Sequence, residues 1–236
     1  MELMVAIYLV VFIAALFQSS VGFGANLIAM PIVVQLDPDL VPGAVLLANT
    51  VISTFVVIRD HSGIRWRLVV SATSGAIAGA TLGAFVLRHL SSDGLGVVVA
   101  LCVLGAVALS LIRRSPARSV PNMMAAGAAS GFSGSTAGIA GPPIALLFAG
   151  APPNEFRGTL GLFFVTTSAT SFTALHLAGR FGADQLAAGL LLTPATLCAF
   201  VLSRPLLRYV DVAMIRPAVF GVSTASAVVL LARLVI

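Results

Sequence analysis

The first 36 residues hold the feature that most constrains the fold, an apolar run that is too long for a single membrane crossing. It extends from Leu3 to Leu36, a stretch of 34 residues, whereas one helix crosses the hydrocarbon core in about 20 residues. Gly22 and Gly24 interrupt the run where a bilayer would be deepest. The run therefore predicts a helix that is broken inside the membrane.

The composition indicates an integral membrane protein that resides in a lipid bilayer. Of the 236 residues, 59% are hydrophobic and 9% are charged, whereas soluble domains carry about 25% charged residues. The apolar stretches predict helical spans of about 20 residues rather than barrel strands of about 10 residues. The 13 basic residues are all arginine and lie mostly in short loops. The net charge of +5 therefore indicates membrane topology and no nucleic-acid partner.

The pattern of the first break returns in the second half of the chain. Small hydroxyl residues precede Gly22, and 116 residues later Ser135 and Thr136 precede Gly138. Glycines and prolines that interrupt apolar segments at matching positions of two halves are the best sequence indication of a transporter's binding site. We therefore expect the substrate site at these two breaks.

A direct match between the halves supports an internal duplication. Residues 80–87 read ATLGAFVL and residues 195–202 read ATLCAFVL, which are identical at seven of eight positions. We infer a first transmembrane repeat at residues 1–115 and a second at residues 116–236, which together form a single membrane domain.

The predicted fold class is an all-α polytopic membrane protein. Each half is expected to contain a glycine-rich broken or re-entrant helix followed by three transmembrane helices. The broken segments are expected at residues 3–36 and 123–150, with breaks at residues 22–26 and 138–143. The full crossings are expected at about residues 44–58, 68–87, 94–112, 159–178, 185–203 and 213–234.

The arginines predict that the two halves insert with opposite topology. Short cytoplasmic loops collect Arg and Lys. If each broken segment returns to the face it entered from, one face receives ten arginines: Arg59, Arg65, Arg67, Arg113, Arg114, Arg118, Arg157, Arg204, Arg208 and Arg216. The other face receives only Arg88, Arg180 and Arg233. We infer inverted repeats with both termini outside, and we expect Arg157 to set topology or to form an ion pair with nearby Glu155 at a gate.

The chemistry of a broken helix favours an anionic or neutral substrate. The second piece begins with unpaired N–H groups at the positive end of its dipole, and this arrangement binds anions without lysine or arginine. No Asp or Glu falls within the predicted spans, which weakens a cation pathway. The expected substrate-binding residues are Ser20, Gly22, Gly24, Asn26, Asn49, Thr50, Ser53, Ser135, Thr136, Gly138, Gly141, Pro142, Thr167 and Ser171.

The sequence gives no indication of an enzyme. It contains no nucleophile–base pair and no cofactor motif. The predicted spans hold no Asp or Glu, and only the isolated His176, Cys102 and Cys198 could offer ligands to a divalent metal. We therefore expect no catalytic residue, no cofactor and no bound metal.

Two glycine-rich segments, GFGANLIAMP and GIAGPPIAL, together with RGTLGLFF after the second, resemble the TauE/SafE sulfite exporter family over nearly the whole chain. The resemblance implies a bacterial cytoplasmic (inner) membrane permease that carries sulfite or an organosulfonate, generally outward. It supports Gly22, Gly24, Gly138, Gly141 and Pro142 as site residues. The sequence departs from the family at Ala25-Asn26 and Ala140, where glycine is more usual.

The leading hypothesis is a secondary transporter for a small anion that works by alternating access. A passive channel for an anion or small solute, and a divalent metal permease, are the alternatives. A homodimer is compatible with the sequence, and the specific substrate, coupling ion and direction of transport stay open.

Overall fold

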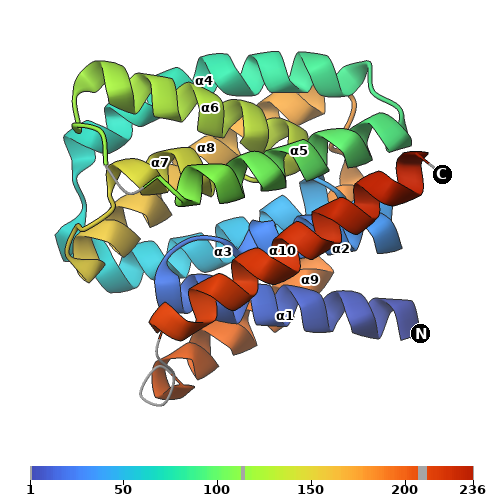
Figure 1. The fold of residues 1–236 in the computed structure, drawn as a ribbon, viewed down its shortest axis with the longest axis horizontal. Coiled ribbons are helices and arrows are strands. Elements are labelled where there is room, and N and C mark those ends of the chain that lie inside the picture. Colours follow the sequence, from blue (N-terminus) through green and yellow to red (C-terminus); the bar gives the residue numbers. More distant parts are fainter. Residues whose placement is uncertain (1, 113–114, 207–211, 236) are drawn as a thin grey trace.

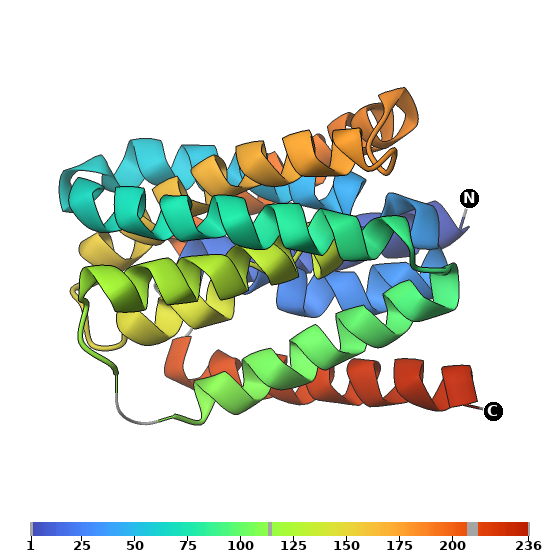
Figure 2. The same ribbon diagram turned by 90° about the horizontal axis from the view of Figure 1, so that it is seen from above.

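The computed structural model describes residues 2–112, 115–206 and 212–235, which form ten α-helices and two short 3-10 helices, with no strand among them. Within the described part of the chain, six helices are long and apolar enough to cross a membrane: α1, α3, α4, α5, α8 and α9. The helices form one bundle in which the two termini lie at the same end (Figure 1, Figure 2). The structure confirms the predicted all-helical, polytopic fold.

The first half consists of five helices. They are α1 (Glu2–Val21), α2 (Ala25–Leu36), α3 (Gly43–Asp60), α4 (Trp66–Arg88) and α5 (Ser92–Ser110), with 3-10 turns at Pro38–Leu40 and His61–Gly63 on either side of α3. The break between α1 and α2 lies at Gly22–Gly24, so Asn26 belongs to the first turn of α2 rather than to the break. Gly22 and Gly24 have φ angles of 102° and 103°, which glycine adopts without a Cβ penalty.

The second half repeats this order. Its helices are α6 (Val120–Ala137), α7 (Gly141–Leu147), α8 (Pro153–Leu177), α9 (Ala183–Leu206) and α10 (Val212–Val235). Several boundaries differ from the prediction by a few residues, and Gly141 and Pro153 each begin a helix that was expected to start later. Proline is favoured in the first turn of a helix, where its missing N–H costs nothing.

The contacts between helices are reciprocal between the two halves. α3 packs against α8 and α5 packs against α10, which are equivalent helices. α4 packs against α6, and the equivalent pair, α9 and α1, also packs together. α3 with α9 likewise matches α8 with α4. Two related five-helix units would produce this arrangement.

Small residues allow α4 and α6 to pack with their backbones in contact. A Cβ atom added to Gly79 would collide with the carbonyl oxygen of Ala128, and one added to Gly131 would collide with that of Ala76. Small residues at such positions let membrane helices approach closely. The glycines of α4 therefore serve packing.

The second broken segment forms a hairpin that returns to its starting end. The Ser115 hydroxyl, just before α6, donates a hydrogen bond to the carbonyl oxygen of Leu147 over 3.1 Å, and Arg118 Nε donates to the same oxygen over 3.0 Å. The end of α7 therefore lies beside the start of α6. Arg113, Arg114 and Arg208 of the predicted topology lie outside the described residues.

Candidate functional site

A small cavity lies between the two breaks. Its walls come from the end of α1, from α2 and α3 of the first half, and from α6, α7 and α8 of the second half. Its volume is about 20 Å³, and a cavity needs about 10–15 Å³ to hold one water molecule. The cavity between the breaks is therefore large enough for about one water molecule.

Three side-chain oxygens around this cavity have no hydrogen-bond partner among the described residues. They are Asn49 Oδ1 on α3 and the hydroxyls of Thr167 and Ser171 on α8. Leaving a buried polar group unpaired costs about 1–3 kcal/mol. Thr167 and Ser171 are each 1% exposed, so bulk water does not meet this cost. Both hydroxyls therefore border the cavity without a partner among the described residues.

The side chain of Gln18, near the end of α1, lies at the start of α2. Its Oε1 accepts the backbone N–H of Ala25 over 3.2 Å, and its Nε2 donates to the hydroxyl of Ser53 over 3.0 Å. Ser53 in turn donates to the carbonyl oxygen of Asn49. Gln18 thus satisfies one of the free donors that a helix N-terminus exposes and connects the first break to the polar face of α3.

The second break offers fewer donors than the first. α7 has only seven residues, GPPIALL, and Pro142 and Pro143 carry no N–H. The expected anion site made of free N–H groups at a helix start is therefore better supported at α2 than at α7. In the second half, the hydroxyls of Thr167 and Ser171 supply the polar groups.

The structure places eight of the fourteen expected site residues on the cavity wall. These are Gly24, Asn26, Asn49, Gly138, Gly141, Pro142, Thr167 and Ser171. The other six lie elsewhere: Ser20, Gly22, Thr50, Ser53, Ser135 and Thr136.

The hydroxyls among these six point back to their own helices. Ser20 donates to the carbonyl oxygen of Leu16, Thr50 to that of Leu46, and Ser135 and Thr136 both donate to that of Phe132. Serine and threonine commonly bond the preceding turn in this way.

Gly22 and Ser53 have other neighbours. Gly22 packs against Arg157, because a Cβ built there would lie 2.7 Å from its Cγ atom. Ser53 accepts a hydrogen bond from Gln18. Both residues support the first break from outside the cavity.

The cavity wall also contains residues that the sequence analysis did not select. Gln18, Ser168 and Phe164 all line it. Gln18 had a usable signal, since it is a long amide in an otherwise apolar helix immediately before the break.

A larger vestibule of about 460 Å³ lies next to the cavity. Pro142 lines both spaces. Phe23 lines the vestibule and packs against Gly141 on the cavity wall, 3.1 Å from a Cβ built there. The Phe23 ring also contacts the Phe156 ring, with centroids 5.8 Å apart. Phe23 therefore lies between the vestibule and the cavity.

The carboxylate of Asp60 forms ion pairs with two arginines beside the first break. Arg157 binds it through Nε and Nη2, over 3.0 and 3.1 Å, and Arg59 binds it through Nε over 3.0 Å. Arg59 Nη2 also donates to the carbonyl oxygen of Ser19 over 3.0 Å, so it caps the negative end of α1. The expected pairing of Arg157 with Glu155 is wrong, because residues two apart on a helix face different directions.

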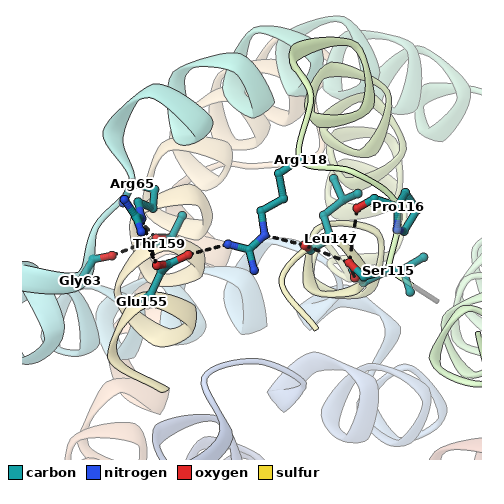
Figure 3. Close-up of polar contacts among 9 residues, drawn as sticks. Gly63, Arg65, Ser115, Pro116, Arg118, Leu147, Glu155 and Thr159 are labelled. Atoms are coloured by element: carbon teal, nitrogen blue, oxygen red, sulfur yellow. Dashed lines mark hydrogen bonds and ion pairs between the residues drawn. The ribbon is translucent and has the colours of Figure 1, made fainter. Parts of the chain in front are cut away.

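Glu155 forms a second cluster at the same end of the bundle (Figure 3). Its carboxylate binds Arg65 over 2.8 Å and Arg118 over 2.6 Å. Figure 1 shows the loop between α3 and α4 opposite the two termini, and Arg65 ends that loop. Arg59, Arg65, Arg118 and Arg157 thus gather at one end, as the topology prediction grouped them.

The family comparison is consistent with this architecture. The family model described as "Sulfite exporter TauE/SafE" matches residues 7–230. The chain belongs to the TauE/SafE family. Neither the curated proteins nor the solved structures gave a match. A TauE/SafE protein is a multi-pass membrane transporter for a small anion, which agrees with the predicted non-enzymatic role.

Proposed function

We propose that this TauE/SafE protein exports a small oxyanion, sulfite or an organosulfonate, across the bacterial cytoplasmic membrane. The observation that carries the proposal is the set of three unpartnered buried oxygens, from Asn49, Thr167 and Ser171, around one cavity between the breaks. The two hydroxyls donate to an oxyanion, and the Asn49 amide presents its NH₂ group after a 180° rotation.

The lining supports an anion over a cation. Every described residue that lines the cavity is uncharged, and α2 directs the positive end of its dipole toward the cavity. The described residues contain no group of three or more His, Cys, Asp or Glu side chains that could hold a metal ion. The divalent metal permease therefore has less support than the anion transporter.

Alternating access is the mechanism we propose for this site. A cavity of about 20 Å³ cannot pass sulfite in its closed form, so the walls must separate before a substrate enters or leaves. The reciprocal contacts of the two five-helix units support inverted repeats that rock around the breaks. The arginine-rich end is then cytoplasmic, and both termini are outside.

Counterflow in proteoliposomes tests the proposal. We expect sulfite or sulfoacetate loaded on one side to accelerate uptake of the labelled anion from the other side. Anion flux without trans-acceleration would favour the channel, and flux of Ni²⁺ or Co²⁺ without anion flux would contradict the proposal.

Isosteric variants then test the site. Thr167→Val and Ser171→Ala remove unpaired hydroxyls, so they should weaken anion binding while leaving the thermal unfolding temperature equal or higher. Thr173→Val is the matched control on the same helix, because its exposed hydroxyl bonds only the Ala169 carbonyl oxygen. Unchanged affinity in both site variants would place the site elsewhere.

A further inference from the structure

The vestibule combines one charged group with an apolar wall. Arg157 is the charged side chain among the described residues that line it. Most of the remaining wall is apolar, with Leu109 from the end of α5, Ile112 just after that helix, Leu146 from α7 and Phe156 from α8. Its volume of about 460 Å³ falls within the range of about 300–1,000 Å³ that is typical of small-molecule pockets.

Arg157 already holds an oxyanion in the geometry that a substrate would need. Its Nε and Nη2 bind the two carboxylate oxygens of Asp60 over 3.0 and 3.1 Å, and neither bond uses Nη1. Bidentate pairing of this kind recognises planar carboxylates and the oxygens of other oxyanions. Arg157 thus presents to Asp60 the two donors that a bidentate anionic guest would use.

Asp60 can release Arg157 without becoming an unpaired buried charge. Its side chain is 9% exposed, and stranding such a carboxylate would be strongly destabilising. Arg59 also binds Asp60, through Nε and Nη2, each over 3.0 Å. The Arg59–Asp60 pair therefore remains when Arg157 turns to another anion.

Arg157 is also in direct contact with the first break. A Cβ built on Gly22 would lie 2.7 Å from Arg157 Cγ and 3.2 Å from Phe156. Phe23, the residue between the vestibule and the cavity, lines the same vestibule as Arg157.

We propose that the vestibule binds an organic oxyanion with an apolar substituent. The charged group of this anion replaces Asp60 as the partner of Arg157, and its apolar part packs against the apolar residues of the vestibule. This proposal rests on the proposed function, because the vestibule would load the cavity from the arginine-rich end. It assigns Arg157 as a substrate-binding residue and favours alkanesulfonates over inorganic sulfite.

A homologous series of alkanesulfonates tests this site on the purified full-length protein. Burying one CH₂ group contributes about 0.8 kcal/mol, which corresponds to about a fourfold gain in affinity. Titration calorimetry from methanesulfonate to butanesulfonate should therefore show affinity rising by about threefold to fourfold per carbon. A flat series would overturn the proposal.

Two variants separate the charged and apolar contributions. Arg157→Gln should lower the affinity of every sulfonate by at least tenfold and keep the chain-length dependence, whereas Leu109→Trp should remove that dependence by filling the wall. Arg67→Gln is the control, because Arg67 is exposed at the start of α4. Equal affinities in the Arg157→Gln and Arg67→Gln variants would overturn the role of Arg157. If Arg157→Gln does not fold, the Leu109→Trp series decides.

The remaining outcomes distinguish the two proposals. Sulfite counterflow with no chain-length dependence would overturn the vestibule site and leave the transport function standing. Absence of any anion flux in the wild type would instead overturn the proposed function. Loss of all sulfonate binding in nanodiscs containing phosphatidylglycerol would identify the vestibule as a lipid site and overturn the inference.

Discussion

Asn26 Nδ2 donates a hydrogen bond to the carbonyl oxygen of Gly138 over 2.6 Å. Asn26 lies in the first turn of α2 and Gly138 ends α6, so this bond joins the break of one half to the break of the other. A Cβ on Gly138 would collide with the Cε atom of Met30 on α2. The unwound backbone of the second half is therefore satisfied by the first half, as buried irregular backbone in a membrane requires.

Replacing Asn26 should destabilise the protein through this bond. Asn26→Ala leaves the buried carbonyl of Gly138 without its donor, so we expect a loss of about 1–3 kcal/mol in the free energy of unfolding. Asn122→Ala is the matched control, since Asn122 Nδ2 makes the same type of bond to the Ala117 carbonyl oxygen at an exposed position. Chemical unfolding in detergent measures both, and equal effects would argue against the bond's importance.

Gln18→Glu should weaken anion binding, and it should also lower the free energy of unfolding, because Gln18 is 2% exposed and the new charge has no cationic partner among the described residues of the cavity wall. The substitution preserves shape and adds a negative charge on the cavity wall, where the N-terminus of α2 stabilises it. Like charges about 5 Å apart repel by about 3 kcal/mol at an effective dielectric constant of about 20, so sulfite affinity should fall by at least about tenfold. Stronger binding of a cation with no loss of anion affinity would support the metal permease instead.

The breaks could be predicted from the sequence because their signals are local. An apolar run of excess length and the glycines and prolines within it can be read from one continuous stretch of sequence, and the second half repeats the pattern. Helical spacing also placed Thr167 and Ser171 on one face, and the structure brings both to the cavity.

The partners of individual polar groups could not be predicted in the same way. Spacing does not distinguish a hydroxyl that bonds its own helix, as Thr136 does, from one directed into a cavity. The partners of Asp60 and Glu155 also depend on contacts between helices that are about 90 residues apart in the sequence. Such pairs follow from the packing of the two halves.

Because α4 and α6 pack closely, adding a single methyl group between them should lower the stability of the protein. Gly79→Ala would direct its Cβ into the carbonyl oxygen of Ala128, and overpacking of this kind costs about 1–3 kcal/mol. Gly105→Ala in α5 is the control, because nothing lies within 4 Å of its Cβ. It should stabilise its helix by about 0.5–1 kcal/mol. Thermal unfolding temperatures should shift in opposite directions, and a shared direction would contradict the packing argument.

The two arginines on Glu155 should be coupled rather than additive. The Arg65 side chain is 61% exposed and that of Arg118 is 33% exposed, whereas Glu155 is 9% exposed. Arg65→Gln alone should cost below about 1 kcal/mol, because Arg118 still pairs the carboxylate. Removing both arginines leaves a buried charge uncompensated, which costs about 3–5 kcal/mol.

A double-mutant cycle measures this coupling by unfolding in detergent. The Arg65→Gln/Arg118→Gln double variant should be less stable than the sum of the single variants predicts, by about 1–3 kcal/mol. Adding Glu155→Gln removes the stranded charge, so the triple variant should recover part of the loss. Effects that add to within about 0.5 kcal/mol, or a triple variant no more stable than the double, would show that Glu155 reaches water once its partners are gone.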